Sequence, residues 1–376
     1  MTSRDFSDRT KFPGNRGNNF DFFLDIAEFL TKIPAILFAL VLCALATLAA
    51  RSDWTQAAVL YAFFLSDWFV LALLPRAGKS FGPAKPSAML LALCRVPFAF
   101  LPPPWWLVFE LIGTALVVYS FWYEPHRLTV TRQVLKSPKL GFARPLRVLH
   151  LGDLHVERLT RRERDLLALI QNIAPDVILF SGDFLNLSYT QDALAHEHAR
   201  AVLAELDAPL GVYVVSGSPA VDPHEIVEKL VGDMDNLVWL RDATALIKHE
   251  GKHIEIVGVN CSHRPFVDGP NLARVLDDAE RERFRILLYH SPDLAPEASD
   301  AGIDLQLSGH THGGQVRIPF YGALYASSLY GKRFESGRHA VGDLTLYVTR
   351  GIGLEGGGAP RIRFNCAPEI ILWELG

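Results

Sequence analysis

Aspartate and histidine side chains gather at the ends of four apolar segments in the C-terminal two-thirds of the chain. The segments cover residues 146–153, 176–183, 284–291 and 302–310. In open α/β sheets, functional groups collect at the carboxyl ends of the strands, so these side chains are expected to converge. The expected cluster consists of Asp153, His155, Asp183, His290, His310 and His312.

This mixture of carboxylates and imidazoles is typical of a transition-metal site. It suits Mn²⁺, Fe²⁺, Zn²⁺ or Co²⁺ better than Ca²⁺ or Mg²⁺. Asp153 and His155 are two residues apart, as are His310 and His312, so each pair would share one face of an extended segment. One carboxylate can bridge two ions, and such a pair stabilises both oxygens of an in-line phosphoryl displacement. We therefore expect two divalent transition-metal ions.

The other histidines have no such context. His150 lies inside the first apolar segment and is expected to be a core residue, whereas four histidines receive no role: His126, His224, His249 and His339.

Short apolar strands alternate with amphipathic helices from about residue 128 onwards, which predicts an α/β domain over residues 128–376. Thr160 and Glu163 form a capping box that opens one of the helices. The strands are uniformly apolar, which is typical of sheets buried on both faces. These strands must position the metal-binding side chains.

Residues 1–127 predict an all-α membrane domain of about four helices. Its apolar segments are 33–50, 55–74, 87–101 and 105–123. A bilayer-spanning helix needs about 20 mostly apolar residues, which fits the first, second and fourth segments. The third is short and contains Arg95 and Pro97, so a re-entrant or an interfacial segment is the alternative to a span.

Basic residues flank the N-terminus, the second loop and the end of the fourth segment. The positive-inside rule then places both termini and the C-terminal domain in the cytoplasm, provided that the third segment spans. Asp67, Arg95 and Glu110 lie within the apolar segments. We interpret them as a structural ion pair, and a transport pathway is the alternative.

Four stretches carry a family resemblance: "LGDLHVER", "LFSGDFLN", "YHSPD" and "LSGHTHGGQVRIP". They resemble the successive motifs of the calcineurin-like metallophosphoesterases. The membrane-anchored bacterial branch is most similar, with the same "GHTHGGQ" and a C-terminal "RGIGLEGG…PEIILWEL" segment. The resemblance implies a β-sandwich flanked by helices, and it implies a location at a bacterial-type inner membrane.

The resemblance also implies how the six residues share two ions. Asp153, His155 and His312 would hold one ion, His290 and His310 would hold the other, and Asp183 would bridge them. A hydroxide between the ions would attack phosphorus in line and hydrolyse a phosphodiester, phosphomonoester or pyrophosphate bond.

The third family motif is altered in this chain. The family has Gly-Asn-His followed by an acid, whereas this chain has Gly217, Ser218, Pro219 and Ala220. A hydroxyl is a weaker ligand than the amide, and proline cannot transfer a proton, so no catalytic general acid is assigned. Ser218, water or Asp222 could complete the second metal site. The alternative function is a weakened or inactive metal-binding or sensing domain on a membrane anchor.

The expected partners follow from these features. The net charge of −4 at pH 7 excludes the whole-protein basic field that marks nucleic-acid binders. The four cysteines are widely separated, so no disulfide is expected. The lipid bilayer and a phosphorylated small-molecule or lipid-linked substrate remain as partners.

Overall fold

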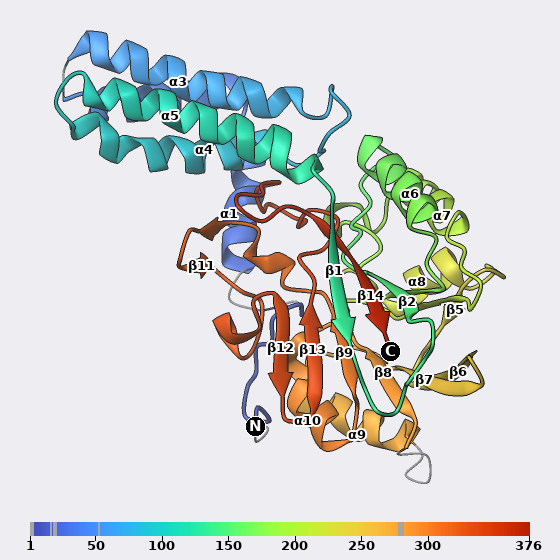
Figure 1. Ribbon diagram of the computed structural model, residues 1–376. Helices are drawn as coiled ribbons and strands as arrows, with labels where there is room; N and C mark the ends of the chain where they lie inside the picture. Colours follow the sequence, from blue (N-terminus) through green and yellow to red (C-terminus); the bar gives the residue numbers. More distant parts are fainter. Residues whose placement is uncertain (1–3, 16, 18–20, 52, 277–281) are drawn as a thin grey trace. The chain divides into compact units, whose positions relative to one another are not determined.

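The computed structural model describes residues 4–376 except residues 16, 18–20, 52 and 277–281 (Figure 1). The chain forms two compact units. The first contains residues 127–354 and 365–376 together with the described residues before 19, and the second contains the helices up to residue 126 together with residues 355–364. The main boundary thus lies between residues 126 and 127, and each unit also includes one short segment from elsewhere in the chain.

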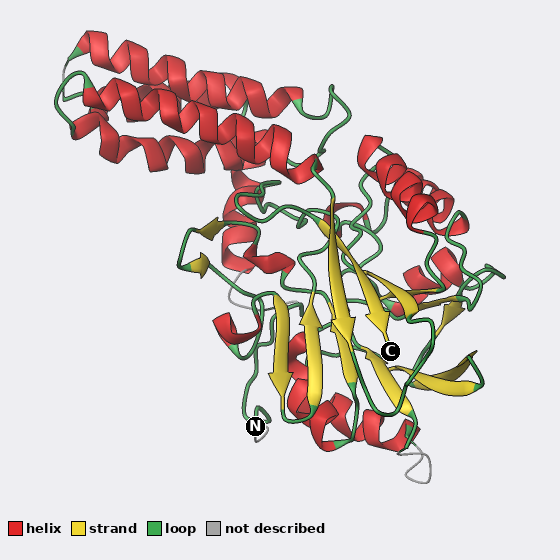
Figure 2. Cartoon of the chain, viewed as in Figure 1, coloured by secondary structure: helices red, strands yellow, loops and turns green. Residues whose placement is uncertain are grey.

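The first unit contains two six-stranded sheets (Figure 2). In spatial order, the first sheet consists of β1 (Thr129–Leu135), β14 (Glu369–Leu375), β2 (Leu146–Leu151), β3 (Val177–Phe180), β4 (Val212–Val214) and β5 (Val238–Trp239). Strands β2 to β5 are parallel, and β14 pairs antiparallel with β2.

The second sheet has β9 and β8 at its centre and antiparallel pairs at both edges. In spatial order, it consists of β12 (Gly337–Val341), β13 (Leu344–Val348), β9 (Leu305–Ser308), β8 (Phe284–Leu288), β7 (Lys252–Gly258) and β6 (Ala243–His249). A separate two-stranded hairpin pairs β10 (Arg317–Ile318) with β11 (Gly322–Ala323).

Three buried clusters make this unit a four-layer sandwich. Between the sheets, residues such as Val148 and Leu179 of the first sheet meet Ile286 and Leu307 of the second. The outer face of the first sheet is covered by α6 (Arg161–Ile173), α7 (Ala193–Ala204) and α8 (His224–Val231). The outer face of the second sheet is covered by α9 (Pro265–Val275) and α10 (Ala295–Asp300). The predicted β-sandwich flanked by helices is confirmed.

Local chemistry fixes several of these elements. Thr160 accepts a hydrogen bond from the N–H of Arg162, and Glu163 accepts one from the N–H of Thr160, so the predicted capping box opens α6. Phe6 and Phe12, near the N-terminus, belong to the apolar cluster of the second sheet. The N-terminal segment, residues 4–15, is thus part of the first unit, although the sequence suggested that it belongs with the helices.

Among its described residues, the second unit contains five α-helices: α1 (Asp21–Lys32), α2 (Ala35–Ala49), α3 (Trp54–Leu73), α4 (Ala84–Arg95) and α5 (Trp105–Val118). In the part of the chain that the structure describes, two helices are long and apolar enough to cross a membrane, namely 54–73 and 105–126. Many of their large apolar side chains are exposed, including Phe69 and Leu111.

The first and third apolar segments form shorter helices than these two. α2 has 15 residues, fewer than the expected span, because the chain bends by 112° between α1 and α2 next to Pro34. Pro34 has an extended backbone and lacks the N–H that would continue the helix. α4 has only 12 residues, as the short third segment indicated, and continues as a 3₁₀ turn from Val96 to Phe100.

The charged residues of these helices are bonded to one another. Arg95 Nε and Nη2 donate to Asp67 at 2.7 and 2.9 Å, and Arg95 Nη1 donates to Glu110 Oε2 at 2.8 Å. All three side chains are buried. A Cβ at Gly113 would lie 2.7 Å from Arg95 Nη1, which explains the glycine in α5. The arrangement is the structural ion pair that the sequence suggested, extended to a triad.

Candidate metal centre

The six predicted ligands come together at one edge of the sandwich. Asp153 and His155 follow β2, Asp183 follows β3, His290 follows β8, and His310 and His312 follow β9. The strands are buried and parallel at this edge, so their carboxyl ends meet there. All six side chains are buried.

The backbone of these residues was wrongly expected to be extended. Five of the six have positive φ, between 45° and 72°: Asp153, His155, Asp183, His310 and His312. Each strand ends before its ligands, so the two-residue alternation of a strand does not aim them. Left-handed backbone costs energy for non-glycine residues and collects at functional sites, where the surrounding structure maintains it.

Asp153, His155 and His312 form the first group of candidate ligands. Their ligand atoms lie within 4.8 Å of one another. His155 Nε2 is 2.9 Å from His312 Nε2, and His312 Nε2 is 3.9 Å from Asp153 Oδ1. At this distance the two nitrogens can share one proton. Without that proton, both can direct a lone pair towards one ion beside them.

Asp183 stands between the first group and the next. Its Oδ2 atom is 3.4 Å from His155 Nε2 and 3.3 Å from His290 Nε2. Asp153, Asp183 and His290 also form a possible ligand group. A carboxylate equally distant from both sets of imidazoles is placed where a bridge between two ions would be.

The altered third motif forms the loop after β4. The N–H of Ser218 donates to Asp183 Oδ1 at 2.7 Å, and Ser218 Oγ lies 3.1 Å from His290 Nε2 and 3.4 Å from His310 Nδ1. A Cβ at Gly217 would lie 2.0 Å from Asp183 Oδ1, so this approach requires glycine. The loop therefore still reaches the centre without the family's amide.

Asp222 holds this loop against Asp183. Its carboxylate accepts hydrogen bonds from the N–H groups of Asp183 at 2.7 Å, Gly217 at 2.9 Å and Phe184 at 3.1 Å. These bonds occupy both oxygens, so Asp222 acts through the backbone of its neighbours. The sequence suggested Asp222 as a replacement ligand, but its contacts are those of a positioning residue.

His263 is a buried member of the cluster that sequence reasoning missed. It lies in the loop after β7, and its Nε2 atom is 3.1 Å from Ser218 Oγ. It forms a possible ligand group with His290 and His310. The available signal was its place a few residues after an apolar strand, which is where the other histidines lie.

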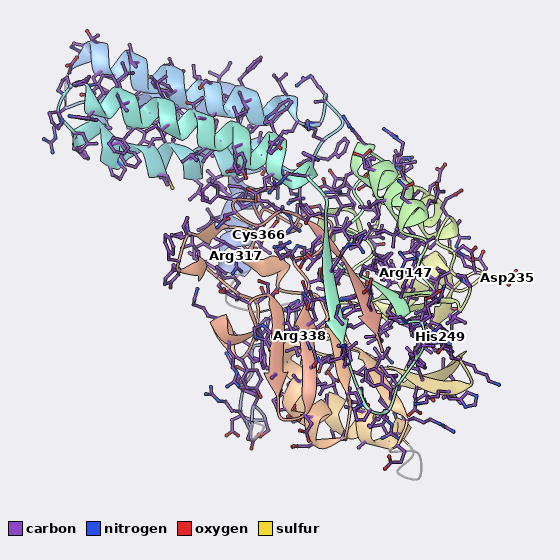
Figure 3. All side chains as sticks on the ribbon, viewed as in Figure 1. Arg147, Asp235, His249, Arg317, Arg338 and Cys366 are labelled. Carbon is purple, nitrogen blue, oxygen red and sulfur yellow. The ribbon has the colours of Figure 1, made fainter. Side chains whose placement is uncertain are left out.

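His249 and His150 bond to residues outside the group of candidate ligands. His249 is at the end of β6 and contacts the carbonyl of Arg144 (Figure 3). His150 is buried and bonded to Ser181 Oγ, and burial lowers its pKa to about 3, as befits a core residue.

Burial and mutual charge shift the acid–base behaviour of the centre. Burial opposes a charge on His290, but Asp183 and Asp153 outweigh it and raise the pKa of His290 to about 9. Burial lowers the pKa of His263 to about 3 and that of His310 well below its usual range. Burial also raises the pKa of Asp153 to about 6. His263 and His310 are thus neutral at neutral pH, as metal ligands must be, whereas His290 carries a proton there.

The donor atoms themselves fit metal ions. Asp153 Oδ2 is buried and makes no hydrogen bond to any described residue. Such orphaned polar atoms are costly unless something else satisfies them. Imidazoles and carboxylates in this proportion suit Mn²⁺, Fe²⁺, Zn²⁺ or Co²⁺. The residues present therefore fit divalent transition metals.

Comparison with known proteins places this centre in a family. A family model described as "Calcineurin-like phosphoesterase" matches residues 146–314, which include all six predicted ligands. Residues 146–314 therefore form a calcineurin-like phosphoesterase domain. This metallophosphoesterase is 29% identical to the metallophosphoesterase YkuE of Bacillus subtilis over 266 residues, which cover 68% of this chain and 88% of YkuE.

Two other relatives carry names that describe an activity. Phosphodiesterase YaeI of Escherichia coli is 29% identical over 68% of this chain and 92% of its own length. UDP-2,3-diacylglucosamine pyrophosphatase LpxG of Chlamydia trachomatis is 23% identical over 68% of this chain and 91% of its own. The chain is accordingly a metallophosphoesterase, a hydrolase of phosphoric ester or anhydride bonds.

Proposed function

We propose that this metallophosphoesterase is anchored in a membrane and uses two divalent transition-metal ions to hydrolyse a lipid-linked phosphodiester or pyrophosphate. Asp153, His155 and His312 would hold one ion, His290 and His310 the other, and Asp183 both. The position of Asp183 Oδ2 between His155 and His290, at 3.4 and 3.3 Å, is the observation that carries the proposal.

The ions, when bound, lower the pKa of water and offset charge on the phosphoryl oxygens. The chain's own residues hold that arrangement. Asp222 fixes the backbone N–H groups of Asp183 and Gly217, and the N–H of Ser218 fixes one carboxylate oxygen of Asp183. The other oxygen, Oδ2, then stays directed towards His155 and His290.

The third motif favours a substrate with a good leaving group. Pro219 stands where the family has a histidine and cannot donate a proton. A leaving phosphate has a pKa of about 6, far below that of a simple alcohol, so it departs without needing a proton. A pyrophosphate, or a diester with an acidic leaving group, therefore needs no strong general acid.

An exposed apolar hairpin next to the centre favours a lipid-linked substrate. Ile318, Phe320, Tyr321, Leu324 and Tyr325 are exposed on the β10–β11 hairpin. The hairpin follows the loop of His310 and His312, and a Cβ at Gly314 would lie 2.5 Å from Ala323 Cβ. Contiguous exposed apolar surface marks interaction sites. The similarity to LpxG, whose name specifies a diacylated substrate, is consistent with this choice.

The two spans, 54–73 and 105–126, support the anchor. The basic residues that flank the apolar segments favour a cytoplasmic catalytic domain. Protease accessibility in sealed inverted vesicles tests this orientation, because a cytoplasmic domain is then cleaved without detergent.

The test of function uses the full-length protein in detergent with Mn²⁺. We expect hydrolysis of bis-p-nitrophenyl phosphate and of a nucleotide-linked lipid pyrophosphate, and loss of both in Asp183→Ala. Two bound ions per chain with turnover no higher than that of Asp183→Ala would refute hydrolysis. The alternative, a metal-dependent sensing domain that Ser218 and Pro219 suggest, would then stand.

A further inference from the structure

We propose that His263 is a ligand of the second metal ion and replaces the amide that the family's third motif supplies. The inference rests on the two-ion centre proposed above and adds a residue from outside the family's motifs. His263, His290 and His310 would then place three imidazoles around one ion, with Asp183 as the shared carboxylate.

Three imidazole nitrogens surround Ser218 Oγ, which stands where the family has an asparagine side chain. Ser218 Oγ is 3.1 Å from His263 Nε2, 3.1 Å from His290 Nε2 and 3.4 Å from His310 Nδ1. The ligand atoms of the three histidines lie within 4.8 Å of one another, and all three side chains are buried. The short serine side chain leaves His263 close to the other two imidazoles, where a longer asparagine would compete for the same space.

His263 shares the backbone conformation of the other ligands. Its φ is 60°, within the range of 45° to 72° found for Asp153, His155, Asp183, His310 and His312. A strained backbone at a buried histidine calls for surroundings that enforce it.

Hydrogen bonds connect the loop of His263 to the segment after β8 that contains His290. Asp268 accepts hydrogen bonds from the N–H and Oγ of Ser262 at 2.9 and 2.7 Å, and from the hydroxyl of Tyr289 at 2.6 Å. Tyr289 precedes His290, so one buried carboxylate ties the positions of His263 and His290 together. This is how outer residues orient metal ligands.

A role as proton donor to the leaving group fits these contacts less well. His263 is only 1% exposed, and a Cβ at Gly14 would lie 2.2 Å from its Nε2 atom. The N-terminal segment thus covers the ring, and a leaving group has no open approach to it on that side. An imidazole is also a far better ligand than the hydroxyl of Ser218 for the metals that this centre suits.

The test measures Mn²⁺ binding to the metal-free full-length protein in detergent, by equilibrium dialysis with elemental analysis and by calorimetry. We expect two ions per wild-type chain. In His263→Ala and His263→Phe, the affinity for one ion should fall by about 100-fold or more, since loss of an outer partner alone costs 10–100-fold. The Phe variant fills the volume that Ala leaves empty, so it separates loss of the ligand from a packing defect. His249→Ala, which removes a peripheral imidazole, should bind both ions as the wild type does.

A compensating variant makes the test specific. His263→Ala combined with Ser218→Asn restores the family's amide and frees the space for it, so the second ion should return to within about 10-fold of wild-type affinity. Both His263 variants binding two ions with unchanged affinity would overturn the inference while the proposed function stands. A lower kcat with unchanged metal binding would likewise overturn it in favour of a proton-donor role. A wild-type chain that binds no more than one ion refutes the two-ion centre itself.

Discussion

Asp222 allows the positioning argument to be tested apart from the ligands. Its carboxylate accepts three backbone N–H bonds, from Asp183, Phe184 and Gly217, and it is buried. Asp222→Ala removes all three acceptors. Asp222→Asn keeps one oxygen for two of these donors and turns an amide NH₂ towards the third.

The magnitudes follow from those bonds. A hydrogen bond to a charged group contributes about 1.5–3 kcal/mol, and an unsatisfied buried donor costs about 1–3 kcal/mol. Asp222→Asn loses one such bond, so we expect a cost of about 2–3 kcal/mol at the loop. Asp222→Ala loses three, and water that enters the space left by the side chain offsets part of the cost. Displacement of Asp183 should lower metal affinity by about 10–100-fold in Asp222→Asn, as is typical for residues behind a metal ligand.

The assay is calorimetric Mn²⁺ binding to the full-length protein, together with its melting temperature in detergent. Asp235→Asn is the matched control, because Asp235 is exposed at the periphery of the first unit (Figure 3). It should leave metal affinity and melting temperature unchanged. If Asp222→Asn binds both ions with wild-type affinity, the three N–H bonds do not position Asp183 and the reasoning is wrong.

Two further predictions concern close approach and pH. Gly217→Ala would bring a Cβ to 2.0 Å from Asp183 Oδ1, so Asp183 must shift and hydrolysis of bis-p-nitrophenyl phosphate should fall by about 100-fold; unchanged kcat/KM would contradict this. In the metal-free protein, Asp183 and Asp153 raise the pKa of His290 to about 9 against the effect of burial, so at neutral pH an ion must displace a proton from His290. Mn²⁺ affinity should therefore rise by about tenfold per pH unit up to about pH 9. Calorimetry in buffers of different ionisation enthalpy should detect the release of about one proton per chain. An affinity independent of pH would refute the proton exchange.

The sequence predicted the parts of the centre that lie on single segments. Apolar strands followed by Asp153, Asp183, His290 and His310 are local patterns, and the helix cap at Thr160 depends on only four consecutive residues. The short third apolar segment was likewise readable from its length and composition. These features depend only on residues that are close together in the chain, so the sequence is sufficient to predict them.

Long-range packing decided what the sequence could not predict. His263 is 45 residues from Ser218 and 27 from His290, and only the adjacency of β7 and β8 brings it to the centre. Asp222 could be taken for a ligand until its three N–H partners were known.

The sequence by itself determined the ligand types, the order of the strands that carry them and the apolar character of the first third of the chain. Only the tertiary structure decided the left-handed backbone that aims Asp153 and His155, and the packing of the N-terminal segment against His263. The physical reason is that both depend on contacts between segments far apart in the chain. Local propensity disfavours a left-handed histidine, and the surrounding fold must supply the energy that maintains it.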